Sequence, residues 1–202
     1  MVRGFAWFTM TLLALGVAAY AGAALFAASL RTPFVQNLFA SLPAAIFVHL
    51  AGGLVAIVLG AFQVNSRLRS RFLSIHRWAG RGYVFAVLVG SASGFVLALN
   101  SFGGLVTHFG FGLMAICWLA TTLNAYRHIR GGDLVAHRAW MLRSYALTLA
   151  AVTLRIYLPL SQIAGIEFEA AYQVISWLCW VPNLLVIEWF VLTRSPAPAV
   201  AT

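Results

Sequence analysis

The chain consists of long apolar segments separated by short polar ones. Because about 20 residues of helix cross a hydrocarbon core about 30 Å thick, six of these segments are long enough to span a membrane. Lipid offers backbone amides no hydrogen-bond partner, so each span must be helical. We expect the spans near residues 5–30, 44–64, 78–99, 105–126, 139–160 and 171–193. The sequence therefore predicts an all-α membrane protein with six transmembrane helices.

Composition and charge agree with a membrane location and exclude a water-soluble globule. Of the 202 residues, 62% are hydrophobic and 8% are charged, whereas about 25% are charged in a typical soluble domain. All 13 basic residues are Arg, and the net charge is +9. In so apolar a chain this charge favours anionic lipid over nucleic acid as a partner. We therefore expect contact with membrane lipid and no binding of nucleic acid.

The distribution of Arg predicts how the spans are oriented. Residues 67–81 and 127–143 are rich in Arg, whereas the connections 31–43 and 161–170 together hold one Arg and two Glu. By the positive-inside rule, both Arg-rich turns and both termini are cytoplasmic. We expect a multi-pass protein of the bacterial inner membrane, with a single domain over 1–194. The Pro- and Ala-rich tail over 195–202 is expected to be disordered.

An internal repeat organises the middle of the chain, where residues 44–99 correspond to residues 105–160. The matching positions are His49 with His108, Gly53 with Gly112, Asn65 with Asn124, and His76-Arg77 with His137-Arg138. Each copy is a helical hairpin. Two such hairpins in tandem predict a central four-helix bundle made of spans two to five.

Four histidines occupy two matched depths in this bundle. His49 and His108 are expected within one to two turns of the outer face, and His76 and His137 at the cytoplasmic mouths of spans three and five. An approximate two-fold axis along the membrane normal would bring each pair face to face. Two facing imidazoles are the geometry of a bis-histidine haem, so the pairs predict one or two haem b groups. Alternatively, the outer pair forms core hydrogen bonds and the inner pair faces lipid phosphates.

Small and basic residues beside the histidines suit such a macrocycle. The expected space comes from Gly53 and Gly112, with Gly52 and Gly110, on the outer side, and from Gly80, Gly82 and Gly60 on the inner side. Haem propionates are anions that need basic partners. These are expected to be Arg155 for the outer site and Arg77, Arg81, Arg138 or Arg143 for the inner site. The alternative for Arg155 is snorkelling to the outer headgroups.

Two polar residues in the last span also carry predictions. Glu188 lies inside the cytoplasmic end of the span, where an unpaired carboxylate is costly. It is expected to form an ion pair with Arg143 or Arg81, or alternatively to deliver protons to a quinone or an inner cofactor. Asn183 follows Pro182 at a kink, where its amide satisfies a freed carbonyl or contributes to a quinone pocket.

Several motifs in the chain carry a resemblance to a known family. They are His76-Arg-Trp-Ala-Gly-Arg-Gly-Tyr83, Arg130-Gly-Gly-Asp133, His137-Arg-Ala-Trp-Met-Leu-Arg143, Ala151-Val-Thr-Leu-Arg155, and Trp177-Leu-Cys-Trp-Val-Pro-Asn183 with Glu188. These resemble the bacterial predicted membrane protein family called domain of unknown function 2306, over roughly residues 45–190. That resemblance implies a fold and no assigned activity.

The architecture is also similar to that of the diheme cytochrome b-561 family of six-helix membrane electron carriers. In that family, alternate helices of a central four-helix bundle supply two His pairs. The resemblance implies that His49 pairs with His108 and that His76 pairs with His137. The sequence departs from the family in the shorter spacing between the two His of one hairpin and in the Arg beside both inner His.

These observations lead to three hypotheses of function. The first is a membrane b-type cytochrome, possessing quinone-linked oxidoreductase activity, that moves electrons between a quinol in the bilayer and an acceptor at one face. Its partners would be quinol or quinone and a respiratory protein or a second copy of the chain. The second is a haem-free membrane scaffold or an assembly factor for a respiratory complex. The third is a small-molecule or metal transporter with the His along its path.

Overall fold

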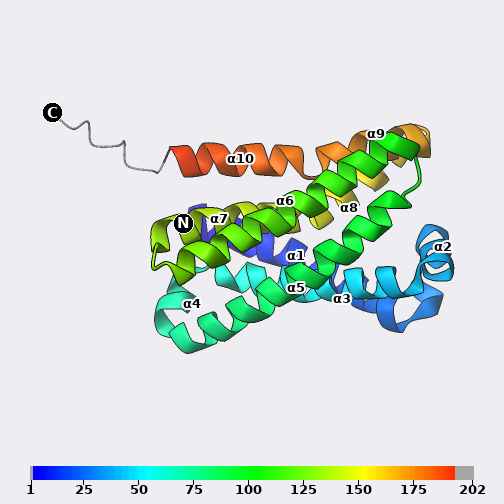
Figure 1. Cartoon of the computed structure of the whole chain (residues 1–202). Coiled ribbons are helices and arrows are strands. Elements are labelled where there is room, and N and C mark those ends of the chain that lie inside the picture. The colour runs from blue at the N-terminus through cyan, green and yellow to red at the C-terminus, as the bar shows by residue number, and fades with distance from the viewer. Residues whose placement is uncertain (1, 194–202) are drawn as a thin grey trace.

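The computed structural model describes the backbone of residues 2–193 and the side chains of these residues except 2, 3, 66–68, 191 and 192. Residue 1 and residues 194–202 lie outside the described residues, and with them the tail predicted to be disordered. The helices are α1 (Val2–Phe26), η1 (Ala28–Leu30), α2 (Pro33–Ser41), α3 (Pro43–Gln63), α4 (Ser66–Arg71), α5 (Leu73–Leu99), α6 (Gly104–Arg130), α7 (Leu134–Thr148), α8 (Ala150–Ile163), α9 (Phe168–Leu178) and α10 (Val181–Leu192). Figure 1 shows the long helices side by side, joined by short turns.

Six helical segments of the described chain are long and apolar enough to cross a membrane, which confirms the predicted fold class. They are Gly4–Phe26, Pro43–Gln63, Leu73–Leu99, Gly104–Arg130, Leu134–Ile163 and Phe168–Phe190. The third, fourth and fifth are longer than predicted because the helices continue through their Arg- and His-rich ends. As a result, His76 and His137 lie inside helices, three residues after the first residue of α5 and of α7.

Glycines and a side-chain cap allow the turns on either side of α6 to be short. Gly103, before α6, has φ +93°, and Gly132, after it, has φ +81°. Both values lie in the left-handed region that favours glycine. Asp133 then begins the next helix, because its Oδ1 accepts a hydrogen bond from the Ala136 backbone N–H at 2.9 Å. Such capping satisfies an amide that has no partner within the helix.

The central bundle consists of α3, α5, α6 and α7. Helix α3 packs along α5, α5 along α6 and α6 along α7, and a smaller contact between α3 and α7 closes the ring. Helix α1 packs against α3 and α8 from outside, while α9 and α10 pack against α6, α7 and α8. The closest approach of α3 to α5 is at Gly52, where a Cβ would lie 2.8 Å from the Ala86 carbonyl oxygen. Small residues permit such backbone contact between membrane helices.

The fifth and sixth spans are both interrupted inside the protein. The fifth breaks at Leu149, between α7 and α8, and the sixth near Cys179, between α9 and α10. Asn183 joins the two breaks, since its Nδ2 donates to the carbonyl oxygens of Cys179 at 3.1 Å and Ala146 at 3.3 Å. Its Nδ2 also lies 3.0 Å from Thr153 Oγ1. The predicted role of Asn183 at a kink is therefore confirmed, and the interrupted backbone is satisfied inside the protein, as a membrane requires.

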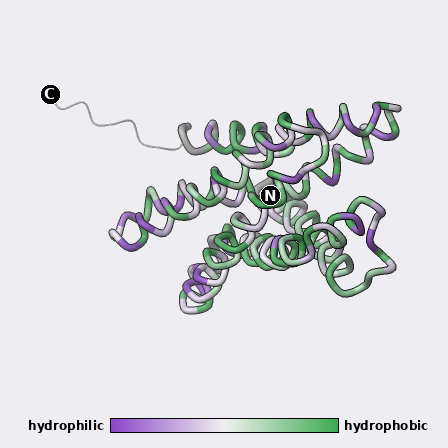
Figure 2. The backbone as a smooth tube through the Cα atoms, turned by 45° about the vertical axis from the view of Figure 1, so that its right-hand side comes forward, coloured by the Kyte–Doolittle hydropathy of each residue, from purple (hydrophilic) through white to green (hydrophobic). Residues whose placement is uncertain are grey.

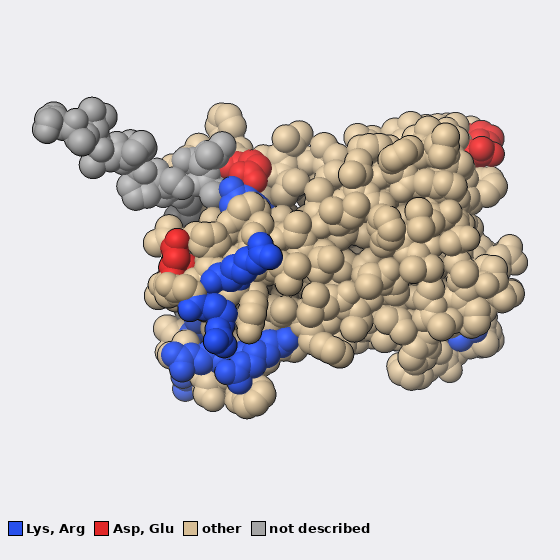
Figure 3. Space-filling model, in the orientation of Figure 1, with Lys and Arg blue, Asp and Glu red and all other residues tan. Residues whose placement is uncertain are grey.

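Charge is concentrated at the two ends of the molecule. Hydrophilic positions gather near the turns in Figure 2. Figure 3 shows most of the visible basic surface at one end, a small basic patch at the other, and an uncharged middle on that face. We call this the Arg-rich end; it carries Arg69, Arg71, Arg77, Arg81, Arg127, Arg130, Arg138 and Arg143. Helix α1 begins there and α10 ends there (Figure 1). The opposite end, where α5 meets α6, is the Arg-poor end, and the cytoplasmic assignment of the Arg-rich end stays a prediction.

Candidate functional site

His49, on α3, packs against α5. Its Nδ1 lies 2.9 Å from the Gly90 carbonyl oxygen. Because a carbonyl only accepts hydrogen bonds, Nδ1 carries the proton and Nε2 is an acceptor in the neutral ring. A Cβ on Gly94 would lie 2.9 Å from the same Nδ1, so the ring fills the space that this glycine leaves.

His108, on α6, is bound at a different depth. Its Nε2 donates to the Ser101 carbonyl oxygen at 3.0 Å, in the turn that joins α5 to α6. Gly90, which binds His49, lies nine residues before the last residue of α5, Leu99, which is about 14 Å along the helix. The two rings therefore bind carbonyl groups at different levels of α5 and the turn that follows it, unlike the shared depth predicted from the repeat.

The glycines near these two histidines differ in what they contact. Gly52 lies in the contact of α3 with α5, and Gly110 lies against the Ser176 side chain of α9. A Cβ on Gly112 would make ordinary contact with the Phe95 ring at 3.7 Å, and a Cβ on Gly53 would meet no atom within 4 Å. Gly52 and Gly110 thus allow helices to pack closely, instead of making room for a porphyrin as predicted.

Aromatic side chains and hydroxyl groups fill the middle of the bundle. Tyr83 OH lies 2.7 Å from Ser144 Oγ and 2.9 Å from Thr148 Oγ1, and all three residues are buried. Thr122 Oγ1 lies 2.7 Å from Ser144 Oγ, and Trp118 Nε1 donates to Thr148 Oγ1 at 2.9 Å. This buried hydroxyl network joins α5, α6 and α7. The sequence interpretation missed it, although the repeat contained a signal, since Tyr83 and Ser144 occupy equivalent positions.

His76 and His137 lie near the Arg-rich starts of α5 and α7, two helices that a buried hydrogen bond connects. Tyr83 follows His76 by seven residues, and Ser144 follows His137 by seven residues. Seven residues are about two helical turns, so His76 shares a helix face with Tyr83, and His137 shares one with Ser144. The hydrogen bond between Tyr83 and Ser144 joins these two faces directly. His76 and His137 are also close enough for their charges to interact. The pairing of His76 with His137 around a haem stays a prediction.

Around His76 and His137, one nitrogen of the His137 ring and the space beside Gly80 are available to a ligand. His137 Nδ1 donates to the Ala125 carbonyl oxygen at 2.9 Å, which fixes the ring orientation and leaves Nε2 as the acceptor. Metal-bound histidines in proteins usually have such a second hydrogen bond. One turn after His76, a Cβ on Gly80 would meet no atom within 4 Å, whereas a Cβ on Gly82 would lie 3.2 Å from Leu59.

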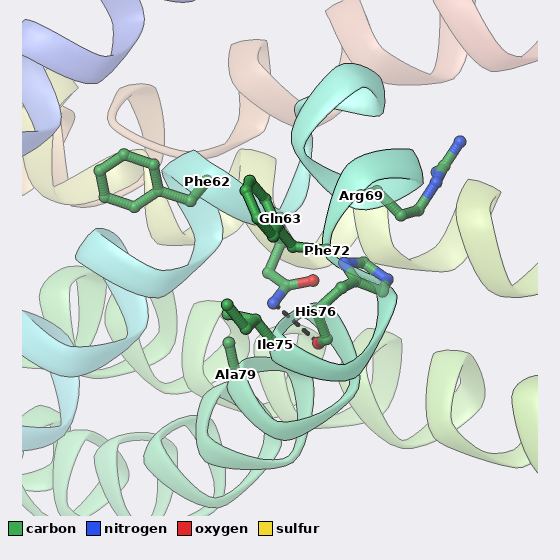
Figure 4. A pocket seen from close by; sticks show the side chains of 7 residues that line it. All are labelled: Phe62, Gln63, Arg69, Phe72, Ile75, His76 and Ala79. Atoms are coloured by element: carbon green, nitrogen blue, oxygen red, sulfur yellow. Dashed lines mark hydrogen bonds between the residues drawn. The ribbon is translucent and has the colours of Figure 1, made fainter.

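A pocket of about 190 Å³ opens beside His76, among α3, α4 and α5 (Figure 4). It is lined by Phe62, Gln63, Arg69, Phe72, Ile75, His76 and Ala79. Gln63 Nε2 donates to the His76 carbonyl oxygen at 3.0 Å, which connects the end of α3 to the start of α5. The pocket is mainly apolar, with three polar side chains in its wall.

The basic residues near His76 and His137 differ in whether they already have an ionic partner. Arg143 Nε donates to Glu188 Oε1 at 2.5 Å, and its Nη2 donates to Oε2 at 2.7 Å. The predicted ion pair of Glu188 is therefore present. Because its guanidinium is held by this carboxylate, Arg143 is a poorer candidate for a haem propionate than predicted, whereas Arg77, Arg81 and Arg138 are exposed.

Residues 46–191 match the family described as Predicted membrane protein (DUF2306). The chain belongs to this family. No curated protein and no solved structure shows a significant match to the chain. The matched range of the DUF2306 protein contains all four paired histidines and both helix breaks. The family description names a membrane protein and no activity, so function has to be argued from the site.

Two predicted site residues of this DUF2306 protein lie away from the pair of His76 and His137. The amide of Asn183 is engaged by the helix breaks, which leaves little hydrogen-bonding capacity for the predicted quinone contact. Arg155 lies on α8, beside His49 and the Tyr20 ring of α1. The predicted contact of Arg155 with a haem propionate stays a prediction.

Proposed function

We propose that this DUF2306 protein is a b-type cytochrome-like membrane electron carrier that binds one haem b between His76 and His137. The observation that carries the proposal is the hydrogen bond of Tyr83 with Ser144, which connects the faces of α5 and α7 that hold the two histidines. A bis-histidine haem needs only two ligands from the protein. A bare transition-metal ion usually needs three or more, and the described residues contain no group of three or more His, Cys, Asp or Glu that fits one.

The donor set near the pair supports this assignment. Arg77 and Arg138 directly follow the two histidines, and Arg81 also lies at this end, so exposed guanidinium groups are available for two propionates. The open Cβ position of Gly80 supplies space on the face of His76. The pocket of about 190 Å³ is smaller than the roughly 300–1,000 Å³ of typical ligand sites and has no residue of α7 in its wall, so a macrocycle bound to both histidines would need space beyond it.

A haem bound here would supply one-electron exchange, and the chain would bind and orient it. The imidazoles of His76 and His137 hold the iron, and the buried hydroxyl network keeps α5 and α7 in register. The proposed electron partner is a lipid-soluble quinol or quinone, because the apolar pocket beside His76 also contains the polar side chain of Gln63. One haem would restrict electron exchange to the Arg-rich end.

The spectrum of the purified protein tests this proposal. Protein produced with haem available should show a sharp reduced alpha band and about one haem per chain in a pyridine haemochrome assay. His76→Ala and His137→Ala should each remove the band, whereas His49→Ala and His108→Ala serve as matched controls and should retain it. Loss of the band in the two controls alone would assign the haem to the other pair and refute the proposed site.

A haem-free membrane scaffold is the second candidate, and one observation favours it. The strongest polar contacts in the protein hold helices together, namely the hydroxyl network, the ion pair of Arg143 with Glu188 and the Asn183 amide. Colourless, iron-free protein made with haem available would refute the cytochrome proposal and leave this scaffold. Its partner would then be sought among membrane proteins that co-purify with the wild type.

A further inference from the structure

Arg155 carries a positive charge inside the half of the protein toward the Arg-poor end. It lies eight residues before the end of α8 at Ile163, about 12 Å along the helix. Its Nη1 donates to the Ala151 carbonyl oxygen at 2.9 Å, but its Nε is buried and has no hydrogen-bond partner. A snorkelling Arg would extend its polar atoms to the headgroups. The buried Nε of Arg155 therefore has a hydrogen-bonding capacity that the described chain does not satisfy.

The carboxylates of the described chain do not neutralise this charge. Glu188 pairs with Arg143, and Asp133 lies 3.4 Å from His128 at the Arg-rich end. Glu167 accepts two backbone N–H bonds at the start of α9, and no ion pair to Arg155 is present among the described residues. An unpaired charge in a membrane interior is costly, so a bound anion would stabilise it.

Arg31, at the same end of the molecule, provides a comparison. Its Nε donates to the Ala24 carbonyl oxygen at 2.7 Å and its Nη2 to the Leu25 carbonyl oxygen at 3.3 Å. Its guanidinium carbon also lies 3.7 Å from the Phe39 ring centre. The chain itself thus provides hydrogen-bond partners for the Arg31 guanidinium. Arg155 has the weaker aromatic contact, at 4.8 Å from the Tyr20 ring centre, and an unsatisfied donor.

His49 gives the Arg155 site a second polar group. It is close enough to Arg155 for their charges to interact. Since its Nδ1 donates to the Gly90 carbonyl oxygen, the neutral ring offers Nε2 as an acceptor. A ligand that satisfies both residues therefore needs an anionic oxygen for Arg155 and a hydroxyl donor for His49.

We propose that Arg155 and His49 bind the headgroup of an anionic phospholipid that carries a hydroxyl group, such as phosphatidylglycerol, from the leaflet at the Arg-poor end. Helices α1, α3 and α8 supply Tyr20, His49 and Arg155, and α1 packs against both of the others. The phosphate contacts Arg155, and a glycerol hydroxyl donates to His49 Nε2. Inorganic phosphate shares the first of these contacts. The site is independent of haem binding at His76 and His137.

Native mass spectrometry in a mixture of phosphatidylglycerol and zwitterionic phosphatidylethanolamine tests the proposal. The wild type should retain one phosphatidylglycerol. Arg155→Gln should weaken this binding about tenfold to a hundredfold, because a charge-assisted hydrogen bond is lost. Arg31→Gln is the matched control at the same end and should bind as the wild type does. Equal retention by the wild type and Arg155→Gln would overturn the proposal.

A second variant keeps the test decisive if Arg155→Gln fails to fold. His49→Phe retains a ring but removes Nε2, so it should lose the preference for phosphatidylglycerol over phosphatidylmethanol, an anionic phosphodiester without a hydroxyl group. An unchanged preference would refute the role of His49. A third experiment measures the thermal stability of the protein with inorganic phosphate alone. Thermal stabilisation of the wild type and not of Arg155→Gln, with no lipid retained, would support anion binding and identify a soluble anion as its source.

Discussion

Replacing Glu188 by Gln should destabilise the protein by about 2 kcal/mol. The side chains of Arg143 and Glu188 are 16% and 35% exposed, so their ion pair is neither fully buried nor freely exposed. Removing one partner of a buried pair costs about 3–5 kcal/mol, whereas exposed pairs contribute about 0–1 kcal/mol. The bidentate geometry and the partial exposure of Glu188 place the expected cost between these limits.

Reversible unfolding in mixed micelles at increasing denaturing detergent would measure this cost. Glu188→Gln, Arg143→Gln and the double variant form a double-mutant cycle, which isolates the interaction of the pair from its effects on other contacts. We expect a coupling free energy of about 1–2 kcal/mol. The charge reversal of Arg143→Glu with Glu188→Arg should recover part of the stability that either reversal alone removes.

A different outcome would refute this structural reasoning. If Glu188→Gln unfolds at the same detergent fraction as the wild type but loses the electron exchange with quinol proposed above, Glu188 transfers protons and the ion pair adds nothing to stability. Equal stability of all four members of the cycle would also show that the pair has no structural effect. Reduced stability with electron exchange intact supports the reasoning.

Three further predictions concern the bundle and one helix end. Tyr83→Phe should cost about 1 kcal/mol in the same unfolding assay, since Ser144 keeps its other hydrogen bonds, and should lower haem content if the bridge aligns the histidines. Gly52→Ala should cost about 1–3 kcal/mol because its Cβ would press on the α5 backbone, whereas Gly53→Ala, with no atom within 4 Å, should not cost stability through any clash. Two backbone N–H groups hold the pKa of Glu167 below its ordinary value. The carboxylate therefore stabilises the folded state fully at pH values above that ordinary pKa. The melting temperature of the wild type should therefore exceed that of Glu167→Gln at pH 7, and the difference should vanish as the pH falls through the lowered pKa.

Much of the fold could be predicted because the membrane constrains it strongly. The thickness of the hydrocarbon core determines how many apolar residues a span requires, so six segments of that length predict six helices. The ion pair of Glu188 was predictable for a similar reason, since a carboxylate inside a membrane requires a cation at its own depth and few are present. Both predictions depend on composition and depth alone.

The direction in which a side chain points was harder to predict. Gly52 and Gly110 are small residues beside histidines, and the sequence does not show whether a small residue faces a cofactor or a neighbouring helix. The structure has them facing α5 and α9. The rotation of each helix about its axis depends on contacts between spans, which a repeat in one chain does not encode. His49 and His108 are equivalent in sequence for this reason, and yet their rings bind different carbonyl groups.

The break at Leu149 marks the level at which the two copies of the internal repeat stop matching in structure. Up to that break, α7 occupies the place in the second repeat that α5 occupies in the first, and the hydrogen bond of Tyr83 with Ser144 joins the two helices. Beyond it, α5 continues unbroken to Leu99, whereas α8 packs mainly against α9 and α1. The internal symmetry therefore extends over the Arg-rich half, where His76 and His137 lie, and ends before the level of His49. In the other half, Arg155 follows the break on α8 and its charge acts on His49, so the departure from symmetry supplies the two residues of the site proposed for an anionic lipid.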